Sequence, residues 1–129
     1  PIAGQTIIVR KALARQSPEF VENMLKAQIE ALAFALSPRN KPAVLELMKK
    51  RLRISSPSAL EESYKDMMEE VDRKPYPSAE GLANIQRFMK TLSPKLAELK
   101  IDDVADNRWV RRLDESGFID RTFAVAGVK

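Results

Sequence analysis

The residues that could do chemistry in this chain are carboxylates, lysines, serines and tyrosines, because it contains no histidine and no cysteine. This excludes thiol nucleophiles, disulfides, imidazole bases and the usual zinc ligand sets. Carboxylates are densest in one predicted helix, where they recur every three or four residues beside Lys65: Glu61, Glu62, Asp66, Glu69, Glu70 and Asp72. Such spacing is typical of a solvated helix face rather than of a metal or acid–base site.

The remaining polar residues give no site pattern either. The aspartates at 102, 103, 106 and 114 lack the alternating ligands, central glycine and closing glutamate of a calcium loop, and we expect Asp102 or Asp106 to cap a helix. Four scattered glycines cannot form a phosphate cradle. The serines lie mainly beside prolines, with no histidine to activate them. We therefore predict no catalytic residue, no metal and no cofactor, and the chain is not expected to be an enzyme.

The net charge of +4 comes from 22 basic and 18 acidic residues, a mild excess. The densest basic run, from Lys49 to Arg53, has no interleaved aromatic residue that could stack on bases, and cations there would offset the dipole at a helix end. A second run surrounds Trp109, whose helical spacing with Leu113 favours an amphipathic contact over a cation–π site. We therefore do not expect nucleic acid as a partner. An affinity for DNA that falls with added salt would show that this expectation is wrong.

Adjacent serine and proline residues recur along the chain and predict where helices begin. Five such pairs occur at intervals of roughly 17 to 20 residues, each before a stretch that favours a helix: Ser17-Pro18, Ser37-Pro38, Ser56-Pro57, Pro77-Ser78 and Ser93-Pro94. The segment 18–36 is apolar on more than one side and should be the central helix. With 44% apolar residues in 129, we expect one mainly α domain or fragment of about five helices, with a helical portion over 11–120 and a tail over 121–129.

The N-terminal segment departs from this helical pattern. Residues 5–9 read Gln-Thr-Ile-Ile-Val, a β-branched run that predicts one short buried strand within residues 1–10. No other segment offers it a partner, and a buried strand needs its backbone groups paired. Either the sheet belongs to a larger protein of which this chain is a piece, or the strand pairs with another copy to form a dimer.

A second unusual segment places Tyr76 between two prolines, Pro75 and Pro77. Two prolines so close make a stiff, extended connector. We expect it to be a packed linker that holds Tyr76 against a neighbouring surface before the next helix.

Three stretches, taken in order, resemble the C-terminal region of periplasmic substrate-binding proteins of ABC transporters, in the nitrate, sulfonate and taurine group that includes thiamine-precursor binders. The first is a strand leading into residues 10–13 and then residues 17–27, which start at Ser-Pro and end in Leu-Lys-Ala. The second is the Pro-Tyr-Pro link within residues 74–82. The third is residues 109–120, which resemble a closing helix ending in Gly-Phe.

This resemblance implies the C-terminal part of a two-lobed α/β receptor that is periplasmic or otherwise extracytoplasmic. Residues 1–10 would be the strand that crosses between lobes, and Gly4, Gln5 and Thr6 are the residues most suited to hydrogen-bond an anionic solute. Most ligand contacts would come from the earlier part of such a receptor, and the helices would face the membrane permease. The alternative is a stand-alone helical domain for protein interaction or dimerisation.

Overall fold

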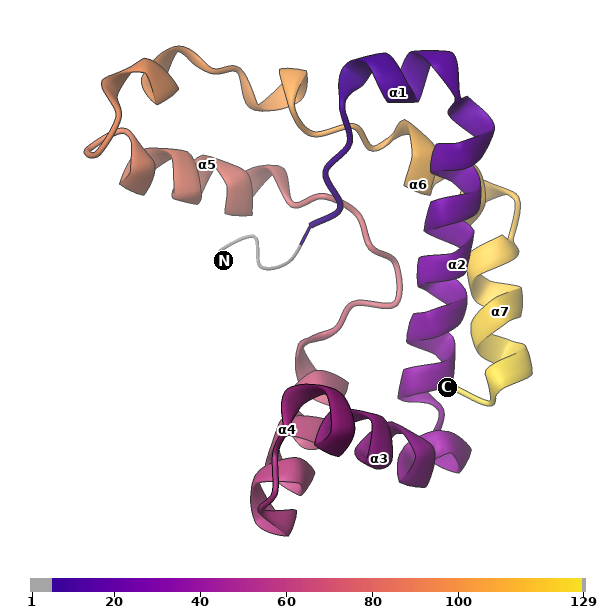
Figure 1. Cartoon of the computed structure of the whole chain (residues 1–129). Coiled ribbons are helices and arrows are strands. Elements are labelled where there is room, and N and C mark those ends of the chain that lie inside the picture. Colours follow the sequence, from indigo (N-terminus) through magenta and orange to yellow (C-terminus); the bar gives the residue numbers. More distant parts are fainter. Residues whose placement is uncertain (1–5, 129) are drawn as a thin grey trace.

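The computed structural model describes residues 6–128, and all regular structure in this range is helical (Figure 1). The mainly α prediction is confirmed, but the described range holds seven α-helices rather than about five. They are α1 (Lys11–Gln16), α2 (Pro18–Leu36), α3 (Lys41–Leu52), α4 (Pro57–Glu70), α5 (Ala79–Met89), α6 (Arg108–Glu115) and α7 (Phe118–Ala126). Three short 3-10 helices accompany them: η1 (Pro38–Asn40), η2 (Pro94–Glu98) and η3 (Ile101–Asp103).

Most of the predicted helix starts are confirmed. Helices α2 and α4 begin at Pro18 and Pro57, because proline fixes φ and lacks the N–H that a first turn leaves unpaired. Ser78 caps α5 by accepting a hydrogen bond from the Gly81 amide at 3.0 Å. The pairs at 37–38 and 93–94 start 3-10 helices instead, so a serine–proline pair marks a turn into helical backbone without fixing the length of the helix after it.

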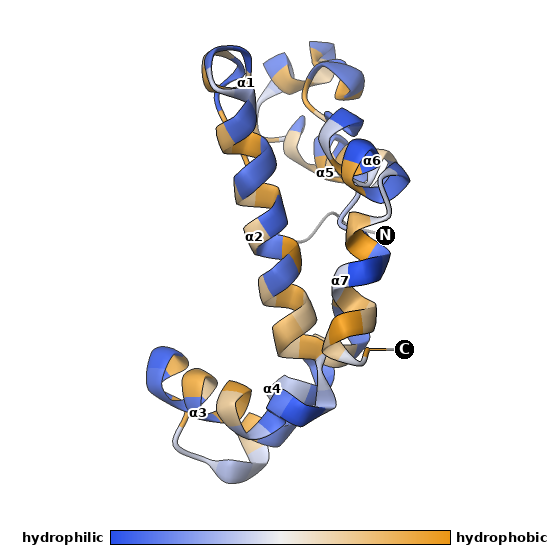
Figure 2. Ribbon diagram, turned by 90° about the vertical axis from the view of Figure 1, so that its right-hand side faces the viewer, coloured by the Kyte–Doolittle hydropathy of each residue, from blue (hydrophilic) through white to orange (hydrophobic). Residues whose placement is uncertain are grey.

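Helix α2 is the central helix, as its two-sided apolar pattern predicts. It packs against α7, α6, α1 and α3, and Figure 2 shows hydrophobic residues where α2 and α7 meet near the C-terminus. The main core is a cluster of buried side chains from three helices. Its members are Ile29, Ala33, Leu36, Val110, Leu113, Ile119 and Phe123.

Two further units extend from this spine. The α3–α4 hairpin buries Val44, Leu60 and Tyr64. The second unit, residues 79–103, comprises α5, η2 and η3 and is called the α5 arm here. Within the arm the Gln86 side-chain amide donates to the backbone carbonyls of Leu96 and Leu99, both at 2.6 Å.

The predicted tail over 121–129 is wrong, because residues 118–126 form α7. Gly117 does end α6, in the left-handed region at φ 71°, but the chain re-enters a helix at the next residue. The far end of α7 is tied down by the α2–α3 junction. There the buried Ser37 hydroxyl donates to the Ala126 carbonyl at 2.6 Å, and an Arg39 Nη2 donates to the Val125 carbonyl at 3.1 Å.

The predicted N-terminal strand is not formed in the described residues. Residues 1–5 lie outside them, and residues 6–10 have no regular secondary structure. Within the described range no backbone hydrogen bond involves residues 6–9, and Ile8 is 88% exposed. The strand does not form because a strand needs a second strand to pair with, and residues 6–128 contain none.

The molecule is open in shape. In Figure 1 the α5 arm and the α3–α4 hairpin project to the same side of α2, near its two ends. The chain has 9647 Å² of accessible surface, whereas a compact monomer of its mass would have about 6,900 Å². The helices therefore leave much more surface in water than a closed domain of this size.

Candidate functional site

The residues expected to contact a solute lie at the start of the chain. Gly4 and Gln5 fall outside the described residues. Thr6 is exposed, and no described side chain makes a hydrogen bond or ion pair with it. The structure thus brings no other functional group to Thr6, and its role in binding stays a prediction.

A cluster of polar side chains joins the connector before α5 to the corner between α6 and α7. Lys74 Nζ lies 2.6 Å from Asp114 Oδ1 and 3.3 Å from Asp120 Oδ1. The Tyr76 hydroxyl donates to the other oxygen of Asp114, Oδ2, at 2.8 Å. We call these four residues, Lys74, Tyr76, Asp114 and Asp120, the clasp.

The connector is not extended throughout, contrary to the sequence prediction, because residues 73–74 form a bend and the Tyr76 amide donates to the Lys74 carbonyl at 2.8 Å, which closes a three-residue turn around Pro75. The two donors of the clasp lie at the ends of this turn. The prediction that Tyr76 is held against a neighbouring surface is confirmed by its bond to α6, although its side chain remains 38% exposed. Asp114 as the partner of Tyr76, and Asp120 as a partner of Lys74, could not be found from the sequence, because they lie 38 and 46 residues further along the chain. No local spacing signals such a contact.

The hydrogen bonds of the clasp favour the charged forms of Asp114 and Lys74 and the neutral form of the Tyr76 hydroxyl. Hydrogen bonds from Lys74, and then from Tyr76, lower the pKa of Asp114 below its ordinary value. The same bonds raise the pKa of Lys74 and of the Tyr76 hydroxyl, in each case chiefly through Asp114. A carboxylate with a lowered pKa and both oxygens occupied is a poor general base. The arrangement is therefore suited to holding segments together rather than to catalysis.

A second polar group lies on the surface of α2. Glu22 pairs with Lys26 at 2.7 Å and with Arg112 of α6 at 3.3 Å, and these contacts, that to Lys26 first, lower its pKa. Arg112 also lies over the Trp109 ring, 5.5 Å from its centre. Trp109 is partly buried and makes the cation–π contact that was the alternative in the sequence analysis, and it is not among the residues of the main core or those packed against it.

The other charged runs lie where the sequence predicts them. The α4 carboxylates are exposed, and the pair between Lys65 and Glu69, at 3.7 Å, spans one turn of that face. The basic run from Lys49 to Arg51 fills the last turn of α3. Asp106 is not the capping residue that the sequence predicts, because Asn107 holds the N-cap position of α6 and its side chain makes no capping bond. Asp106, one residue earlier, accepts a hydrogen bond from the Arg108 amide at 3.1 Å.

The described residues offer no enclosed site for a cofactor. Two hollows in the described surface are open depressions, one beside Lys41 and Tyr64 and the other beside Glu22 and Arg112. Within residues 6–128 no three acidic side chains come together in a way that could hold a metal ion. In the same range, no helix is both long and apolar enough to cross a membrane.

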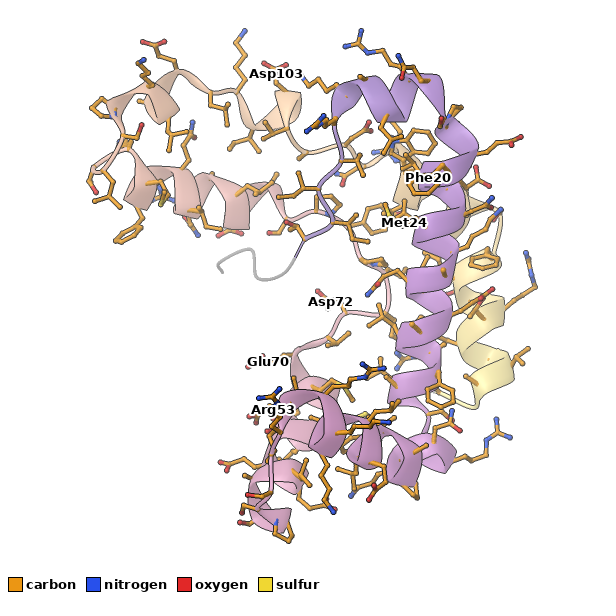
Figure 3. The ribbon with its side chains drawn as sticks, viewed as in Figure 1. Phe20, Met24, Arg53, Glu70, Asp72 and Asp103 are labelled. Carbon is orange, nitrogen blue, oxygen red and sulfur yellow. The ribbon has the colours of Figure 1, made fainter. Side chains whose placement is uncertain are left out.

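The most unusual feature is the amount of apolar surface that nothing covers. Figure 3 shows Phe20 and Met24 on α2, and Phe20 is 56% exposed. Other large apolar side chains that are at least 60% exposed come from the N-terminal segment, α3, the α5 arm and α7. They are Ile8, Leu52, Phe88, Leu92 and Val125. These side chains are spread over four parts of the chain, and a contiguous patch of such residues is what marks an interaction site.

Comparison with protein-family models, with curated proteins and with solved structures finds no match to this chain.

Proposed function

We propose that this chain is the C-terminal part of the solute-binding component of an ABC-type importer. In this role it helps to bind a small anionic solute outside the cytoplasm, and the receptor delivers that solute to the membrane permease. The single observation that carries the proposal is the surface left uncovered. The chain exposes about 2,700 Å² more than a compact monomer of its mass, and large apolar side chains contribute to it.

The N-terminal part of that surface favours a β-sheet as the element that covers it. Residues 6–9 are all β-branched and have no backbone partner among the described residues. Pairing them with a sheet of the same receptor would satisfy their amides and carbonyls and shield Ile7 and Ile8. The helices after this segment would then pack around that sheet as structural elements.

The three stretches that resemble this receptor group also support the proposal by their positions. The first contains the junction at Ser17 where α2 begins, the second contains the connector before α5, and the third spans α6 and the turn at Gly117. Each stretch therefore covers a change of direction in the chain. Gly4, Gln5 and Thr6 remain the proposed solute contacts, through backbone amides and a hydroxyl.

A second candidate function is a stand-alone helical domain that dimerises. The same uncovered surface favours it, because a standard interface buries only about 800 Å² on each partner. The two functions differ in what completes the surface: earlier residues of a receptor in one case, a second copy in the other.

The experiment that tests the proposal is expression of this chain joined to whatever its gene encodes immediately upstream, followed by a thermal-shift screen against nitrate, sulfonates and taurine. We expect an upstream segment with alternating strands and helices, and a saturable rise in melting temperature with at least one anion. The absence of such a segment, or a flat response to every anion, would refute the receptor function. Concentration-dependent dimers of this chain alone would then favour the second candidate.

A further inference from the structure

The turn that follows α5 exposes apolar side chains to water. Phe88 is 68% exposed and Leu92, four residues later, is 70% exposed, with Met89 between them in sequence at 36%. In Figure 1 this turn is the part of the α5 arm that lies furthest from α2. These apolar side chains therefore belong to the end of a projection.

The same turn carries positive charge. Residues 81–97 contain three basic residues, Arg87, Lys90 and Lys95, and no aspartate or glutamate, because the four acidic residues of the arm stand at positions 80, 98, 102 and 103. All three basic side chains are exposed. Among residues 6–128, neither lysine forms an ion pair. We call residues 87–95 the arm tip.

The backbone of the arm tip is hydrogen-bonded within the arm. The amides of residues 90–93 donate to the carbonyls of Gln86, Phe88 and Met89, at 2.9 to 3.2 Å. The Thr91 hydroxyl also donates to the Phe88 carbonyl, at 2.7 Å. An unpaired amide would lose its bond to water on entering a lipid bilayer, which is unfavourable. The amides of residues 90–93 would not meet this penalty.

We propose that the arm tip binds the surface of an anionic lipid bilayer, with Phe88 and Leu92 inserted among the headgroups and Lys90 and Lys95 beside the lipid phosphates. Apolar and basic side chains on one short helical segment are the combination that holds amphipathic helices at such a surface. Each lysine near an anionic surface strengthens binding about fivefold. The inference goes beyond the solute-receptor function and does not depend on it.

The size and composition of the arm tip favour a bilayer over a protein or a nucleic acid. A standard protein interface buries about 800 Å² on each partner, and three apolar side chains on one turn cannot supply that area. Binding to single-stranded nucleic acid uses a basic groove with several aromatic side chains, but Phe88 is the one aromatic residue in residues 79–103. A bilayer needs only a few inserted side chains and nearby cations.

Cosedimentation of the chain with lipid vesicles tests the proposal. The vesicles are made of phosphatidylcholine alone, or of phosphatidylcholine and phosphatidylglycerol in equal parts. We expect the chain to bind the mixed vesicles far more tightly than the neutral ones, with an affinity that falls as salt is added. Lys90→Glu combined with Lys95→Glu should weaken binding to the mixed vesicles by about 30-fold or more.

The matched charge control is Lys49→Glu combined with Lys50→Glu, which makes the same change of net charge at exposed sites on α3. Residues 41–70 contain six basic and six acidic residues, so the α3–α4 hairpin has no excess of positive charge. This control should weaken binding by less than about threefold, because salt screens charges that lie far from the bilayer.

The apolar half of the proposal has its own pair of variants. Phe88→Ser combined with Leu92→Ser should weaken binding by about tenfold or more, because both side chains leave water when the arm tip inserts. Leu52→Ser, at a leucine of α3 that is 61% exposed, should leave binding unchanged. Far-UV circular dichroism should report the same helical content in every variant. If the serine pair loses helical content, the lysine pair decides the question.

Insertion is measured separately with an environment-sensitive fluorophore. Since the chain has no cysteine, Thr91→Cys places the label in the arm tip and Ser55→Cys places it between α3 and α4, both at exposed positions. Mixed vesicles should shift the emission of the label at position 91 to the blue and leave that of the label at position 55 unchanged. Equal behaviour of the two labels would contradict insertion by the arm tip.

The proposal is overturned if the chain does not bind the mixed vesicles, binds neutral vesicles equally well, or loses as much affinity in the α3 controls as in the arm-tip variants. A chain that ignores the vesicles and binds a single-stranded oligonucleotide would also overturn it, and would make nucleic acid the occupant. The vesicle assay contains no solute and no upstream segment. Its failure therefore leaves the solute-receptor proposal to be decided by its own experiment.

Discussion

Truncation of the central core residue, Ile29→Ala, should destabilise the chain strongly. Ile29 is fully buried in α2, in the cluster that joins α2 to α6 and α7. Removing three buried carbons should lower the free energy of unfolding by about 2.4 kcal/mol, because each buried carbon contributes about 0.8 kcal/mol. The cavity left behind adds to this, because neighbours collapse only partly, so we expect a loss of about 3 to 4 kcal/mol. The milder Ile29→Val should cost about 1 kcal/mol.

The same truncation at Ile8 is the matched control. Ile8 is 88% exposed, so Ile8→Ala should change the free energy of unfolding by less than about 0.5 kcal/mol. Urea unfolding of each variant, followed by far-UV circular dichroism, gives both values. Equal losses at the two sites would refute the reasoning, because they would mean that Ile8 is covered in the isolated chain. A loss at Ile29 below about 1 kcal/mol would show that the cluster is not a packed core.

Three further perturbations have defined outcomes. Ser37→Ala removes a buried donor and leaves the Ala126 carbonyl unpaired, which should cost about 1 to 2 kcal/mol in urea unfolding. Asp114 has a lowered pKa in the folded chain, so its contribution is present above its unfolded pKa of about 4 and is lost as pH falls through the lower folded value. Asp114→Asn should therefore flatten the acid side of a plot of urea midpoint against pH. Gly117→Ala should lower the melting temperature more than Gly117→Asn, because Gly117 has φ 71° and asparagine tolerates that region better.

Helix starts could be predicted from the sequence because their causes are local. A proline restricts its own backbone and a serine caps the helix next to it, so Pro18, Pro57 and Ser78 mark their helices without help from distant residues. The two-sided apolar pattern likewise indicates that α2 is central, because a helix packed on both sides needs apolar residues on both.

The errors arise where the outcome depends on distant or absent partners. A β-branched run predicts a strand, but residues 6–9 form one only if another strand lies beside them. Helix α7 could not be predicted from Gly117, because a glycine at this position indicates only that the preceding helix ends. The clasp joins Lys74 and Tyr76 to Asp114 across about forty positions, a contact created by the fold alone.

We propose that the uncovered surface of this chain is completed by earlier residues of a solute receptor to which the chain belongs. The most direct measurement is sedimentation of the chain co-expressed, as a separate polypeptide, with the segment that its gene encodes immediately upstream. We expect a one-to-one complex of the two polypeptides, in which the amides of residues 6–9 become protected from hydrogen exchange. A chain that sediments alone, or as a dimer of itself with the upstream polypeptide left free, would contradict it.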